Sequence, residues 1–138
     1  MRSVMRTRCA WNGYVRQVAL SEGIPDSYRP ILMFLHRSPG ASQKSVAEFV
    51  GVTTSAINQV VKGMLEEGYL RKEVDPSDKR SSKLFLTESG EAVGSRLRER
   101  LEEADGKITA FLGEEAEGKL IEQLEAIAEL IRKELGQC

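Results

Sequence analysis

The chain is poor in the residues from which metal sites and disulfide frameworks are built. Its 138 residues include one histidine, His36, and two cysteines. Cys9 and Cys138 lie near opposite ends and have no partner spacing for zinc or for a disulfide framework. A transition-metal centre would have to be built largely from carboxylates and thiols, so we expect no metal and no cofactor.

Long apolar runs are also missing from the sequence. No stretch approaches the roughly 18 apolar residues of a membrane span. The first part of the chain lacks the apolar segment of about seven residues that a secretory signal needs. We therefore expect a cytoplasmic protein without a membrane partner.

The motifs of common enzymes are absent as well. The sequence contains no Gly-rich phosphate loop and no His-Glu-x-x-His pattern. A single histidine leaves no plausible pair of nucleophile and general base. We therefore expect no catalytic residues and no enzyme activity.

Charge is present but unevenly distributed. The net charge is -1, yet residues 1–87 carry 13 Lys and Arg against 8 Asp and Glu, whereas residues 88–138 carry 7 against 13. Any affinity for nucleic acid must therefore come from local charge in the first part. Solvated helix faces alone would account for some of this asymmetry.

Apolar spacing predicts two helices at the start of the chain. Val4, Trp11, Val15 and Val18 share one face of a helix that runs to about Leu20. A second helix is expected to be capped by Asp26 or Ser27, with Pro30 in its first turn, and to end at Ser38-Pro39-Gly40. The residues expected on its buried side are Ile31, Leu32, Phe34 and Leu35.

The next segment has the pattern of a helix-turn-helix. Ser42 is expected to cap a helix over residues 43–50, whose buried face is formed by Val46, Phe49 and Val50, with Ala47 at its edge. Gly51 ends that helix, and Thr53 or Thr54 caps another that continues to Gly68. Two short helices joined by a tight turn that contains glycine form such a unit.

Beyond Gly68 the pattern changes to a hairpin and then to long helices. Residues 69–74 and 82–86 are prone to form strands around a polar loop. Thr87 is expected to cap a long helix, and a final helix follows Gly113. The fold class is therefore mainly α with a small β-hairpin wing. We expect one domain over 1–138, with a winged helix-turn-helix at 25–90 and helical dimerisation parts at 1–22 and 88–138.

The second helix of the helix-turn-helix presents polar side chains opposite its apolar face. Asn58 and Gln59 can pair with adenine through their amides, and the helix start favours phosphate. A merely solvated polar face is the alternative interpretation. We add Ser42, the cap of the preceding helix, and obtain the candidate DNA-binding set Ser42, Thr54, Ser55, Asn58, Gln59 and Lys62.

The loop of the hairpin supplies further candidates, Asp78, Lys79 and Arg80. Arg80 is suited to enter the minor groove, with Asp78 holding its guanidinium by a charge-assisted hydrogen bond. In isolation, ordinary turn chemistry is the better explanation of the same residues. Their position directly after a helix-turn-helix favours contact with DNA.

Residues 51–61, 64–70 and 75–90 resemble the MarR family of regulators, above all in the Asp-x-Arg wing joined to Leu-Thr-x-x-Gly. The resemblance covers about residues 25–90. It implies a homodimer that binds palindromic double-stranded DNA, often as a repressor that releases DNA when a small ligand or oxidant arrives. Gln59 departs from the arginine that many relatives carry, and Gly63 interrupts the recognition helix at a cost of about 1 kcal/mol relative to alanine.

Sensing residues are harder to identify from the pattern. Trp11, Tyr14, Tyr28, Met33 and His36 are candidates to line an effector pocket, although such residues usually pack as ordinary core. Cys9 is a candidate redox switch, with an inert thiol as the alternative. The competing function is a winged-helix module that binds a protein partner, for which affinity would vary little with salt.

Overall fold

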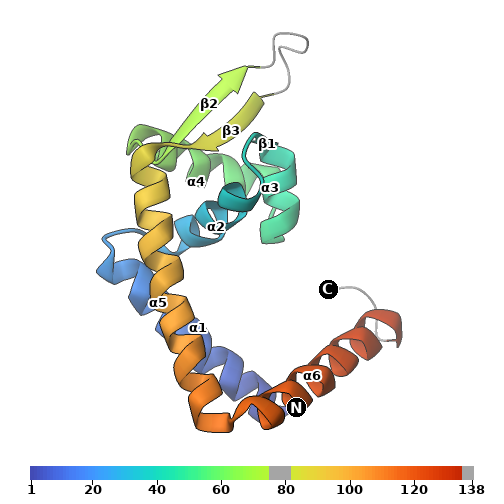
Figure 1. Ribbon diagram of the computed structural model, residues 1–138. Coiled ribbons are helices and arrows are strands. Elements are labelled where there is room, and N and C mark those ends of the chain that lie inside the picture. The colour runs from blue at the N-terminus through green and yellow to red at the C-terminus, as the bar shows by residue number, and fades with distance from the viewer. Residues whose placement is uncertain (75–81, 135–138) are drawn as a thin grey trace. The chain divides into compact units, whose positions relative to one another are not determined.

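The computed structural model describes residues 1–74 and 82–134, and the chain divides into two compact units between Arg100 and Leu101. As the sequence predicts, the fold is mainly helical with a small antiparallel sheet (Figure 1). In chain order the elements are α1 (Arg2–Ser21), the 3-10 turn η1 (Asp26–Tyr28), α2 (Arg29–Arg37), β1 (Ala41–Ser42), α3 (Gln43–Val50), α4 (Thr54–Glu66), β2 (Leu70–Val74), β3 (Ser82–Leu86), α5 (Glu88–Leu112) and α6 (Glu114–Glu134).

Side-chain caps set the start of three helices, as the sequence predicts. The Oγ of Ser42 accepts the backbone N–H of Ser45 at 3.1 Å, and the Oγ1 of Thr53 accepts that of Ala56 at 3.2 Å. Thr87 caps α5 in the same way. These bonds satisfy amides that have no partner within the helix itself.

The predicted cap of the second helix is wrong. Asp26 and Ser27 belong to the 3-10 turn, and α2 begins at Arg29 without a side-chain cap. Pro30 has no N–H to donate to the carbonyl of Asp26. That carbonyl instead accepts the N–H of Arg29, three residues on, which is the 3-10 pattern.

The sheet has the strand order β1-β3-β2. Strands β2 and β3 form the predicted hairpin, with Leu70 opposite Leu86. Strand β1, which the sequence pattern does not reveal, adds to the other edge of β3 and pairs Ala41 with Leu84. This short strand ties the start of α3 to the base of the wing.

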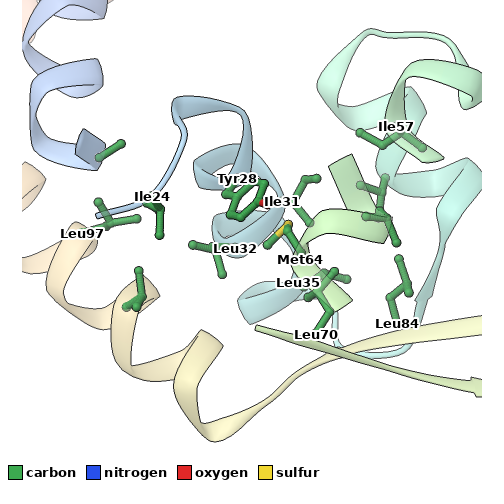
Figure 2. Close-up of a cluster of buried hydrophobic side chains, with 14 of the residues drawn as sticks. Ile24, Tyr28, Ile31, Leu32, Leu35, Ile57, Met64, Leu70, Leu84 and Leu97 are labelled. Carbon is green, nitrogen blue, oxygen red and sulfur yellow. The ribbon is translucent and has the colours of Figure 1, made fainter. Parts of the chain in front are cut away.

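A hydrophobic core lies in the first unit, among helices α1 to α5 and the sheet (Figure 2). Phe49 was expected in this core, but it is 56% exposed. Its ring stacks on that of Phe34, with the two ring centroids 4.5 Å apart. Val46 is buried as expected, and Ala47, which was expected at the edge of the face, is buried in place of Phe49. Because these two residues and Val50 centre the buried face, Phe49 is turned from it by about 100°.

The apolar stripes at the two ends of the chain are exposed. The first half of α1 and the whole of α6 contain no buried residue. In α5, Val93 and Leu97 are buried, whereas Ile108 and Phe111 are exposed. None of the helices in the described ranges is long and apolar enough to cross a membrane.

Candidate nucleic-acid interface

Helix α4 has one apolar and one polar face. Ile57, Val61 and Met64 are buried in the core. The predicted DNA-binding residues of this helix are all exposed, and these are Thr54, Ser55, Asn58, Gln59 and Lys62. Thr54 and Ser55 lie in the first turn, where the helix dipole favours phosphate, and Asn58 and Gln59 follow in the second turn.

Two residues that sequence reasoning missed join this face. The Nε2 of Gln43 in α3 donates a hydrogen bond to the Oδ1 of Asn58 at 3.2 Å. The Nζ of Lys72 in β2 donates to the Oε1 of Gln43 at 3.5 Å. The three elements that carry these residues therefore meet at Gln43, which bonds both Asn58 and Lys72. The available signal for Gln43 was its position next to the cap of the first helix in the unit.

Ser42 is half-buried at the start of α3. Its Oγ accepts the N–H of Ser45 and also lies 3.0 Å from the Oγ of Ser45. The structure therefore accounts for Ser42 as a cap, and its contact with DNA stays a prediction.

The wing adds basic side chains to the neighbourhood of α4. Arg71 lies over the ring of Phe85, with its guanidinium carbon 4.4 Å from the ring centroid, and also pairs with Glu73. Lys72 and Lys83 are exposed on the two strands. The predicted contacts of the loop, Asp78, Lys79 and Arg80, lie outside the described residues.

A buried tyrosine positions the end of α4. The Oη of Tyr28 donates to the Oε1 of Glu67 at 2.6 Å. A Cβ added at Gly63 would lie 2.6 Å from the Oη of Tyr28. Burial and the bond to Glu67 raise the pKa of Tyr28 to about 12. Gly63 therefore permits a close approach between α4 and η1, which offsets its poor helix propensity.

The five predicted pocket residues have varied surroundings. Tyr28 is buried against α4, and Trp11 packs against Tyr14, whose hydroxyl donates to the carbonyl of Arg100 at 3.3 Å. Met33 is half-buried, and the Nδ1 of the exposed His36 lies 3.1 Å from Glu91. A cavity of about 380 Å³ in the first unit is lined by another set, Asn12, Gly13, Arg16, Asp26 and Arg29.

Cys9 is exposed on α1, and its redox role stays a prediction. Among the residues that the structure describes, no group of three or more histidine, cysteine, aspartate or glutamate side chains is placed to hold a metal ion.

Comparison with known proteins agrees with this geometry. Residues 22–81 match the model of the MarR family. The transcriptional regulator BilQ of Clostridium symbiosum is 26% identical over 117 residues, which cover 85% of this chain and 80% of the relative.

Two solved structures have a similar fold. The PcaV transcriptional regulator from Streptomyces coelicolor, solved in complex with its natural ligand, is 28% identical, with a TM-score of 0.72 and coverage of 91% of this chain and 89% of that one. The transcriptional repressor CouR, solved bound to a 23-mer DNA duplex, has a TM-score of 0.80 at 21% identity, with the same coverage. Residues 22–81 therefore match the MarR family of regulators, and the chain as a whole is similar to solved transcriptional regulators.

Proposed function

We propose that the protein is a cytoplasmic, dimeric repressor that binds a palindromic operator through α4 and releases it when an anionic effector binds. The observation that carries the proposal is the exposed polar face of α4, opposite the residues that fix the helix in the core. Its amides and hydroxyls can both donate to and accept from base edges. CouR, which was solved on a DNA duplex and is named a repressor, supports this use of the fold.

The exposed apolar side chains of α6 support a dimer. The exposed fractions of these side chains lie between 37% and 54%, and the residues are Leu120, Ile121, Leu124, Ile127 and Leu130. A second copy would bury such a stripe by the same hydrophobic effect that forms the core. Twofold symmetry would then present two copies of α4 about 34 Å apart, which matches an inverted repeat.

The cavity beside η1 supports a response to an anion. Two arginines, Arg16 and Arg29, are among the residues that line it, and the Nε of Arg29 donates to the Oδ1 of Asp26 at 3.2 Å. A carboxylate can accept two parallel hydrogen bonds from one guanidinium. That PcaV was solved with a natural ligand supports a sensing role for the fold.

Small mono- and dicarboxylates should weaken operator binding by the wild type and leave operator binding by Arg16→Ala unchanged. Equal weakening of operator binding in both proteins would contradict this site.

The test of function is selection from a random double-stranded DNA library at low and high salt. The wild type should enrich an inverted repeat whose recovery falls at high salt, because each phosphate contact releases counterions. Asn58→Ala should lose preference at one base pair of each half-site. The control Lys62→Ala should weaken all sequences alike. No enrichment at either salt would contradict DNA reading and favour the protein-binding alternative.

A further inference from the structure

The bond between Gln43 and Asn58 links the two helices of the helix-turn-helix on the face assigned to DNA. Asn58 is exposed, Gln43 is half-buried, and the Nε2–Oδ1 distance is 3.2 Å. Asn58 was expected to read a base through its amide. The partner of that amide therefore bears directly on which base it reads.

The direction of the bond between Gln43 and Asn58 follows from Lys72, the third side chain in this hydrogen-bonded row. A lysine ammonium can only donate, so Lys72, 3.5 Å from Gln43, requires the amide oxygen of Gln43 on its side. The amide nitrogen of Gln43 then faces Asn58, and Asn58 must present its oxygen to it. The opposite orientation would place an NH₂ group against the ammonium.

The orientation has a consequence for base reading. With Oδ1 held toward α3, the other end of the Asn58 amide is an NH₂ group, which only donates. In the major groove, guanine and thymine present acceptors alone, whereas adenine and cytosine present an exocyclic amino donor. An outward NH₂ group finds no acceptor on cytosine, and on adenine it can bond only N7 and loses the bond that the asparagine oxygen would accept from the amino group. It therefore favours guanine or thymine.

Resting on the proposed function, we propose that Gln43 is a positioning residue that turns the NH₂ group of Asn58 toward the major groove. The residue thereby selects guanine or thymine over adenine or cytosine at one position of each half-site. This preference differs from the adenine pairing that an unconstrained asparagine favours.

Gln43→Glu tests the proposal by reversing the bond. A carboxylate only accepts, so Asn58 must turn its NH₂ group toward residue 43 and present Oδ1 to the groove, while Lys72 keeps an acceptor. The readout is library selection, at the position where Asn58→Ala loses its preference. The wild type should favour guanine or thymine there by roughly tenfold, and Gln43→Glu should favour adenine or cytosine by a similar factor.

Two controls separate orientation from charge and from the loss of the amide. Lys44→Gln changes the net charge by the same amount next to Gln43, at a side chain that pairs with Glu48 at 3.9 Å. It should weaken binding at all sequences without changing the preferred base. Gln43→Met, which keeps the length and removes the amide, should accept both classes of base.

Asn58→Asp gives the same reversal without a change at Gln43, and it covers the case in which Gln43→Glu fails to fold. One carboxylate oxygen accepts from Gln43, and the other presents an acceptor to the groove. Selection of adenine or cytosine by the wild type, or the same preferred base in the wild type and both reversing variants, would overturn the proposal. If the wild type enriches no sequence at all, the proposed function fails and the inference fails with it.

Discussion

Helices α4 and α6 are both amphipathic, yet only α4 buries its apolar side within this chain. Ile57, Val61 and Met64 of α4 are at most 1% exposed, whereas α6 contains no buried residue. Leu124 and Ile127 repeat with the same helical spacing as the residues of α4. An apolar period thus predicts an apolar face, but not whether the same chain buries it.

The difference in burial between α4 and α6 suits the two helices to different roles. The helix-turn-helix is fixed by its own core, so its polar side chains can be held in place for a ligand. Helix α6 retains an apolar surface of the kind that marks an interface.

The largest expected effect is on the covered side. Leu32→Ala should lower the free energy of unfolding by about 2–5 kcal/mol, because Leu32 is fully buried and its truncation leaves a cavity. The matched control is Leu20→Ala, at a side chain that is 57% exposed, where the cost should stay below about 1 kcal/mol. Urea denaturation measures both, and equal losses would contradict the assigned core.

The next effect is on the uncovered side. Leu124→Lys should raise the dissociation constant of the dimer roughly a hundredfold or more, since burying an unpaired ammonium costs several kcal/mol. Glu122→Lys, at an exposed position on the opposite side of α6, is the control and should leave the dimer intact. Sedimentation equilibrium gives both constants. Unchanged association of Leu124→Lys would show that this stripe is not the interface.

The close approach at Gly63 predicts a smaller effect that changes sign. Gly63→Ala should destabilise the fold by about 1–2 kcal/mol, because the new Cβ meets the hydroxyl of Tyr28. In the background of Tyr28→Phe the hydroxyl is gone, and the same change should be neutral or stabilising by up to about 1 kcal/mol. Thermal unfolding of the four proteins measures the coupling; additive effects would show that the two positions do not interact.

The smallest effect is a dependence on alkaline pH. The pKa of Tyr28 is raised to about 12 in the folded protein, against about 10 in an unfolded chain. Its contribution is therefore complete below pH 10 and is lost as the pH rises toward 12, by about 1 kcal/mol at roughly pH 11. The stability of Tyr28→Phe should fall less over this range than that of the wild type, and parallel curves would contradict the assignment.

The elements that depend on local chemistry could be predicted from the sequence. Ser42 and Thr53 cap their helices as their type and position indicate, and residues 70–74 and 82–86 pair as the change of pattern suggests. Features that depend on contacts between elements could not. The pairing of Gln43 with Asn58 follows from how α3 meets α4, and the stacking of Phe49 on Phe34 follows from how α3 meets α2.

The most direct test is native mass spectrometry of the protein with its selected duplex. It asks whether α4 binds DNA while the exposed apolar side chains of α6 join two chains. We predict two chains on each duplex that carries the inverted repeat, and loss of this complex with Leu124→Lys. A single chain on that duplex, or a two-chain complex that survives Leu124→Lys unchanged, would contradict the account.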